Sequence, residues 1–328
     1  MKKILIALLL VTSFLQISCT SDALDKNPTS NPVDVYVVGQ KNSNATYWKN
    51  NQEVLLNNGL GCEADTLMVS NGNVHVFGKK QLDNWTTQFM YWKNNVATNL
   101  TETFNTPEQF VRTITGMDVV GEDVYFVGYT KNPLIAAEIY DLVYWKNGNK
   151  TVIDVATNPT FKSKIKVVNN NVYVIGNKSN CFNNCHGVFV NGDFQAVPVG
   201  VLLKDITVKD NQVYVYGTNY TTSSVYYKNL TTGTESNITS ISTAFKLLFD
   251  NDDLYISNGS DIYKNNSVIY SSSFFSFYID FVVLNDNKYI LKSEGDFGTT
   301  DILYINDVNT LQIFISEGKF NTVSVVQN

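Results

Sequence analysis

The chain has 328 residues, a net charge of −6 at neutral pH and 16% charged residues. An acidic surface with so few charges argues against nucleic acid and anionic lipid headgroups as partners. The sequence holds two histidines and has no GxSxG, HExxH or phosphate-binding glycine loop. We therefore expect neither a cofactor nor a metal site, and no motif supports an enzyme assignment.

Residues 1–18 have the pattern of a bacterial lipoprotein signal peptide. Lys2 and Lys3 precede an apolar run from Ile4 to Leu15, and the segment QISC ends at Cys19. This apolar run is too short to span a membrane comfortably. We expect cleavage before Cys19 and acylation of that cysteine. The alternative is an ordinary secretory signal peptide that has a cysteine near its cleavage site.

Residues 19–32 are polar and contain two prolines, which is typical of a flexible tether. Acyl chains on Cys19 would anchor the protein to a membrane of the cell envelope, and we expect the outer membrane. Asp22 and Asp25 resemble surface-export signals only loosely. The side of the membrane that the protein faces therefore stays open.

Residues 33–328 contain two short phrases that occur seven times each. The first phrase ends in glycine in most copies and reads VDVYVVG (33–39), GNVHVFG (72–78), EDVYFVG (122–128), NNVYVIG (170–176), NQVYVYG (211–217), DDLYISN (252–258) and DNKYILK (286–292). The second reads YWKN (47–50), YWKN (91–94), YWKN (144–147), VFVN (188–191), YYKN (226–229), IYKN (262–265) and LYIN (303–306). The mean repeat length is roughly 42 residues, which in a chain of strands predicts a β-propeller.

Each repeat is expected to supply four strands, named a to d from the inside outwards. Strand b is the first phrase, strand c is the second, and shorter apolar stretches before b and after c give a and d. No strand a precedes residue 33, but FNTVSVVQN (320–328) aligns with FKSKIKVVN (161–169). The C-terminus is therefore predicted to be strand a of blade 1 and to close the ring. The prediction is one all-β domain, 33–328, with seven four-stranded blades; six or eight blades are the alternatives.

Aromatic and asparagine residues recur at fixed places in the repeat. Trp48, Trp92 and Trp145 share one position, which indicates packing between blades rather than ligand stacking. His75 occupies a position that other repeats fill with tyrosine, so it is also assigned to packing. Asn, Asp and Gly dominate the a–b and c–d connections and tolerate the positive φ of tight hairpins.

Three cysteines follow Cys19. Cys181 and Cys185 lie in a CFNNC loop that is followed by His186, and in an oxidising envelope we expect them to form a disulfide. Two free thiols, or a Cys–Cys–His metal site that lacks an evident fourth ligand, are the alternatives. Cys62 is predicted to be a small buried hydrophobic residue.

The phrases resemble those of uncharacterised bacterial surface lipoproteins built from propeller repeats of the type VYVxG…YWKNG. The resemblance covers about 33–328, although Asn258 and Lys292 replace the terminal glycine in the last two repeats. It implies a propeller and a lipid anchor. It brings no catalytic motif, because propellers carry enzymes, lectins and scaffolds alike.

The b–c intervals are longest in blades 2, 3 and 4, which are consecutive around the predicted ring. They would bring together four aromatic residues: Trp85, Tyr129, Tyr140 and Phe182. Variable loops on one face of a rigid scaffold are a common place for recognition. We therefore predict a non-catalytic binding or scaffold protein with a protein or glycan partner. The alternative for these rings is that they pack the loops down.

An envelope enzyme that acts on glycans is the other class of function left open. Paired carboxylates such as those of Asp83, Glu138 and Asp141 would be its candidate acid and base. No motif independent of the repeat supports it.

Overall fold

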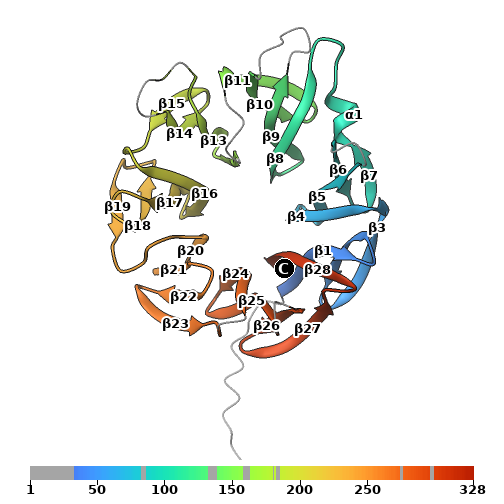
Figure 1. Cartoon of the computed structure of the whole chain (residues 1–328), viewed down its shortest axis with the longest axis vertical. Helices are drawn as coiled ribbons and strands as arrows, with labels where there is room; N and C mark the ends of the chain where they lie inside the picture. The colour runs from blue at the N-terminus through green and yellow to red at the C-terminus, as the bar shows by residue number, and fades with distance from the viewer. Residues whose placement is uncertain are drawn as a thin grey trace, which may run out of the picture.

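The computed structural model describes residues 33–82, 86–131, 139–157, 163–179, 181, 185–273, 276–295 and 299–328. These residues form seven four-stranded antiparallel sheets arranged radially in a ring (Figure 1). The fold is a seven-bladed β-propeller, as predicted. One short helix is the sole helical element of the described residues.

Every blade is a four-stranded meander that runs outwards from the ring axis in the order a, b, c, d. Blade 1 contains β28 (Gly318–Gln327), β1 (Val33–Lys41), β2 (Asn44–Lys49) and β3 (Gln52–Leu60). Blade 2 contains β4 (Cys62–Ser70), β5 (Asn73–Gln81), β6 (Thr87–Lys93) and β7 (Val96–Asn99), followed by α1 (Leu100–Phe104). Blade 3 contains β8 (Phe110–Val120), β9 (Asp123–Lys131), β10 (Tyr140–Lys146) and β11 (Asn149–Thr157). Blade 4 contains β12 (Ile165–Val168), β13 (Asn171–Asn177), β14 (His186–Val190) and β15 (Asp193–Ala196).

The same order continues through the last three blades. Blade 5 contains β16 (Val201–Lys209), β17 (Gln212–Asn219), β18 (Ser224–Asn229) and β19 (Glu235–Ile238). Blade 6 contains β20 (Lys246–Asp250), β21 (Asp253–Ser257), β22 (Asp261–Lys264) and β23 (Ser267–Ser271). Blade 7 contains β24 (Phe277–Leu284), β25 (Asn287–Glu294), β26 (Thr300–Ile305) and β27 (Val308–Phe314).

The C-terminal strand closes the ring. β28 pairs antiparallel with β1 along its whole length, from Val33 opposite Gln327 to Lys41 opposite Gly318, and Figure 1 shows the two strands side by side. The ring of Phe320 in β28 is buried and meets Trp48 edge-on, with 4.9 Å between ring centroids. The predicted closure is confirmed, and the strand begins two residues before the predicted start at 320.

The core consists of apolar clusters between neighbouring blades. Trp48, Trp92 and Trp145 are buried, and each packs against the preceding blade. Trp145 stacks on Phe104 of α1 with 4.7 Å between centroids, and the indole N–H of Trp92 donates to the carbonyl of Asn57 at 2.7 Å. The packing role predicted for the tryptophans is therefore confirmed.

The asparagine that ends each YWKN-like phrase joins strand c to strand b. In Asn147, for example, Oδ1 accepts from the N–H of Val124 at 2.9 Å, and Nδ2 donates to Asp123 at 2.7 Å. The residue has φ 48°, in the left-handed region that asparagine tolerates. The same bond to the start of strand b is made by Asn50, Asn94, Asn191, Asn265 and Asn306. Turn geometry and this side-chain bridge together explain the repeated asparagine.

In blades 1, 2, 3 and 5, the glycine that ends the first phrase lies within strand b, against a kinked part of strand a. A Cβ atom on Gly39, Gly78, Gly128 or Gly217 would lie 2.0–2.2 Å from a carbonyl oxygen of that strand. In each of these blades the a–b register shifts beside the glycine, as at a β-bulge. Only glycine permits so close an approach of the two backbones.

Residues 1–32 lie outside the described residues, and with them the predicted signal peptide, Cys19 and the tether. Acylation therefore stays a prediction. In the part of the chain that the structure describes, no helix has both the length and the apolar character needed to cross a membrane.

Candidate functional site

The two faces of the ring differ in how the strands are connected. In an antiparallel meander, the b–c and d–a connections emerge on one face, here named the connection face. The a–b and c–d hairpins emerge on the other, here named the turn face. Many hairpins of the turn face have two consecutive residues at positive φ, such as Asn50 with Asn51 and Asn265 with Asn266, so they are tight. The b–c connections of blades 2, 3 and 4 join strands on the connection face, and 83–85, 132–138, 180 and 182–184 lie outside the described residues.

Two of the four aromatic residues predicted to bind a partner are buried. Tyr129 has an exposed fraction of 0%, and its hydroxyl lies 2.9 Å from the hydroxyl of Ser163. Tyr140 is 5% exposed, and both rings belong to the cluster that joins blades 3 and 4. This burial corrects the prediction, because neither ring presents a face to a partner; both pack the blades together. Trp85 and Phe182 lie outside the described residues.

A different set of aromatic residues is exposed on the connection face. Among the described residues, all five exposed aromatic side chains lie there: Phe110, Tyr220, Phe245, Phe277 and Phe314, with exposed fractions of 36%, 66%, 54%, 53% and 51%. Exposed aliphatic side chains on the same face are Leu60, Ile139, Val199 and Ile315. These nine residues are named the apolar ring below. Within the part of the chain that the structure describes, no exposed aromatic ring accompanies the exposed aliphatic residues of the turn face and the outer edge.

Seven members of the apolar ring lie at or beside d–a connections, and Ile139 and Tyr220 lie in b–c connections. All of the d–a connections contribute at least one member, except the connection between blades 3 and 4, where 158–162 lie outside the described residues. Phe110 and Phe277 begin strands a, whereas Leu60 and Phe314 end strands d. A phenylalanine stands at or just before strand a in blades 3, 6 and 7, and this repeated position could have predicted the exposed aromatic residues from the sequence. The prediction considered only the b–c loops and therefore did not include these residues.

A charged cluster at the inner edge of the connection face ties the closing strand to blade 2. Lys319 of β28 forms an ion pair with Glu63 of β4 at 2.6 Å, and Asn321 donates to the same carboxylate at 3.0 Å. Burial works against the charged form of Glu63, yet these hydrogen bonds hold its pKa below the usual value. Burial raises the pKa of Asp65, although Lys79 lies 2.9 Å away and opposes the shift. Each carboxylate has an ammonium partner, so we interpret the cluster as a structural tie between blades.

The candidate carboxylates, Cys62 and His75 are either held by contacts within the fold or lie outside the described residues. Gln109 donates to Asp141 at 3.1 Å, while Asp83 and Glu138 lie outside the described residues. Cys62 is 1% exposed, which confirms the prediction that it is buried. His75 is buried, as predicted for a packing residue, and its Nδ1 lies 2.7 Å from the hydroxyl of Tyr91.

The loop that precedes strand c of blade 4 brings its two cysteines close together. The thiol of Cys185 donates to the carbonyl of Cys181 at 2.9 Å, and the disulfide between them stays a prediction. Beside them, Nδ1 of His186 lies 2.9 Å from Oδ1 of Asn177, and Nε2 accepts from the N–H of Leu203 in blade 5 at 2.9 Å. Among the described residues, no group of three His, Cys, Asp or Glu side chains is placed to hold a metal ion.

The chain resembles several solved propellers at low sequence identity. An acylaminoacyl peptidase from Pyrococcus horikoshii is 13% identical with a TM-score of 0.52; the match covers 88% of this chain and 50% of the peptidase. The propeller domain of the Trilobed protease from Pyrococcus furiosus is 11% identical with a TM-score of 0.52, over 89% of this chain and 95% of that domain. Apo AztD from Citrobacter koseri is 7% identical with a TM-score of 0.50, over 89% and 98% of the two chains.

These likenesses show the fold alone, and the chain spans half the length of the peptidase. The Pyrococcus furiosus propeller is described as having an open velcro topology. In this chain, by contrast, β28 and β1 are paired within one sheet. No protein-family model and no curated protein matches the sequence.

Proposed function

We propose that this protein is a non-catalytic, lipid-anchored binding propeller of the bacterial cell envelope, and that its partner is a protein. The partner docks on the connection face, against the apolar ring. The supporting observation is that every exposed aromatic side chain of the described residues lies on this one face. Apolar surface gathered on one face of a soluble domain marks an interaction site.

The composition of the apolar ring favours a protein over a glycan. Phenylalanine and tyrosine occur together with exposed leucine, isoleucine and valine, and such side chains bury well against the apolar anchors of another protein. Glycan sites instead combine an aromatic ring with side chains that hydrogen-bond to hydroxyl groups. The lipid anchor would hold this face within reach of other envelope proteins.

The scaffold beneath the apolar ring is rigid, which lowers the entropy cost of docking. The backbone N–H of Phe245 donates to Ser257 at 2.7 Å, and the ammonium of Lys204 lies 5.0 Å from the centre of its ring. Next to Phe277, the N–H of Tyr278 donates to Gly259 at 3.0 Å. Both aromatic residues are therefore presented from ordered backbone.

A paired capture experiment tests the docking face. Wild type and a Phe245→Ser/Phe277→Ser variant would be cross-linked in envelopes, and the captured proteins identified by mass spectrometry. The variant is expected to lose the partner that wild type captures, with at least about a tenfold drop in yield. Val96→Ser/Val268→Ser is the matched control, because these exposed valines lie on outer strands away from the connection face. Capture that survives in the Phe variant would contradict the proposal.

Acylation and attachment need a separate test. Metabolic labelling with an alkyne fatty acid should mark wild type and leave Cys19→Ala unlabelled. The variant should also move from the membrane fraction to the soluble fraction. A Cys19→Ala protein that stays in the membrane fraction would refute the anchor without affecting the docking face.

A further inference from the structure

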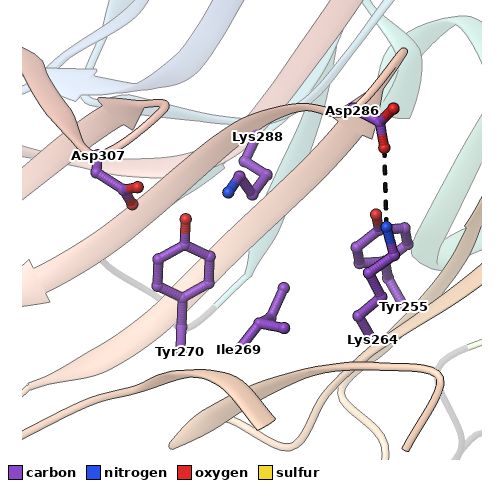
Figure 2. A pocket seen from close by; sticks show the side chains of 7 residues that line it. All are labelled: Tyr255, Lys264, Ile269, Tyr270, Asp286, Lys288 and Asp307. Carbon is purple, nitrogen blue, oxygen red and sulfur yellow. Dashed lines mark ion pairs between the residues drawn. The ribbon is translucent and has the colours of Figure 1, made fainter. Parts of the chain in front are cut away.

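A pocket of about 440 Å³ lies between blades 6 and 7 on the turn face, opposite the apolar ring. Figure 2 shows that its side chains come from both blades. Its polar lining consists of two tyrosines, two lysines and two aspartates: Tyr255, Lys264, Tyr270, Asp286, Lys288 and Asp307. The volume lies within the usual range of small-molecule sites in proteins.

The walls of the pocket are held by buried and repeated polar contacts. The buried carboxylate of Asp250 accepts from the N–H groups of Asn285 and Asp286, both at 2.9 Å, and so fixes the a–b turn of blade 7. Asn306 accepts from the N–H of Lys288 at 2.9 Å, which ties strand b to the turn that carries Asp307. The pocket is therefore shaped by hydrogen-bonded backbone.

The polar lining forms two similar halves, which Figure 2 shows on either side of the pocket. In one half, the ammonium of Lys264 forms an ion pair with Asp253 at 2.7 Å. It also lies 3.8 Å from Asp286 and 5.4 Å from the centre of the Tyr255 ring. In the other half, the ammonium of Lys288 lies 5.3 Å from the centre of the Tyr270 ring. Asp307 lies in the same half as Tyr270, and burial together with this carboxylate raises the pKa of the Tyr270 hydroxyl. Each half thus combines a cation, a carboxylate and an aromatic ring.

The balance of these groups identifies the class of ligand. The lining carries two ammonium groups and two carboxylates, and Asp253 adds a third carboxylate beside Lys264. An anionic ligand would therefore be repelled by carboxylates, and a cationic ligand would meet the two ammonium groups. Sugar hydroxyls satisfy both kinds of group, because they donate to carboxylates and accept from ammonium groups. The side chain of Ile269, which is 37% exposed, and the tyrosine rings offer apolar surface to the C–H face of a sugar ring.

We propose that this pocket binds a mono- or disaccharide unit of a neutral glycan. The site is on the opposite face of the propeller from the apolar ring and does not rest on the function proposed above. A protein that docks on one face and a glycan bound on the other would let the propeller bridge the two.

An oligosaccharide array followed by titration calorimetry tests the site. The detergent-solubilised mature protein would be applied to immobilised neutral, sulfated and uronic-acid oligosaccharides, and the strongest hit titrated in solution. Wild type is expected to bind neutral oligosaccharides. Tyr270→Ala and Lys288→Met should each weaken that binding by about tenfold. Lys146→Met is the matched control and should bind as wild type does, because Lys146 pairs with Asp123 and lies over the Tyr125 ring in blade 3, away from the pocket.

Two outcomes would overturn the proposal: no neutral oligosaccharide binds wild type, or the hit binds both pocket variants unchanged. Retention of acidic glycans only would refute the neutral class. The melting midpoint of each variant is compared with that of wild type, to show that the variant is folded. Lys288→Met retains both tyrosine rings and should change this midpoint less than Tyr270→Ala does.

Discussion

The stability of this propeller should depend on pH through His186, which joins blades 4 and 5. Its Nε2 accepts a hydrogen bond from the N–H of Leu203, so that nitrogen carries no proton in the folded protein. Burial lowers the pKa of His186 from 6.5 to about 4. The unfolded chain therefore binds a proton at a higher pH than the folded chain does.

The sign and size of the effect follow from this difference in pKa. Because the folded pKa lies below the unfolded value, the contribution of the neutral ring is fully present above pH 7.5 or so. It is lost as the pH falls towards 4. The full shift corresponds to about 3 kcal/mol of unfolding free energy, of which about 2 kcal/mol is lost by pH 5.

Urea unfolding of two variants would measure this contribution. Both carry His75→Tyr, which restores the residue common in other repeats and leaves His186 as the remaining histidine. One of the two also carries His186→Gln. The stability advantage of the protein that retains His186 should shrink by about 2 kcal/mol between pH 8 and pH 5. An advantage that stays constant within about 0.5 kcal/mol, or an NMR titration of the imidazole with a midpoint near 6.5, would refute the reasoning.

Three further predictions concern the ring and its loops. Deleting 318–328 removes the buried side chains of Phe320 and Val323, each of which contributes about 1.5–3 kcal/mol to stability. The melting midpoint should therefore fall by about 10 °C or more, and an unchanged midpoint would disprove closure. Gly128→Ala should lower the free energy of unfolding in urea by about 2–4 kcal/mol, because its Cβ would lie 2.1 Å from a carbonyl oxygen. Gly148→Ala meets no atom within 4 Å and should lower it by about 1 kcal/mol. Equal losses would contradict the bulge explanation. Non-reducing peptide mapping should find Cys181 linked to Cys185, and two alkylatable thiols would exclude the bond.

The candidate binding site was less predictable than the fold. Loop length directed attention to the connection face, but it selected Tyr129 and Tyr140, which pack between blades 3 and 4. A sequence does not tell which side of a strand end faces a neighbouring blade and which faces solvent. Phe245 and Phe320 illustrate this: both stand near the start of a strand a, yet one is 54% exposed and the other 2%.

The sequence by itself determined the number of blades, the order of strands and the closing strand. Each blade is built from local hairpins, and their turns and alternating apolar residues recur in every repeat. Only the tertiary structure decided what the glycines and asparagines of the repeat do, since Gly128 meets its neighbour across a bulge and Asn147 bridges two strands. It also decided where the pocket and the apolar ring lie. Both depend on contacts between blades and on which side chains remain exposed, and these arise only when the seven sheets pack around one axis.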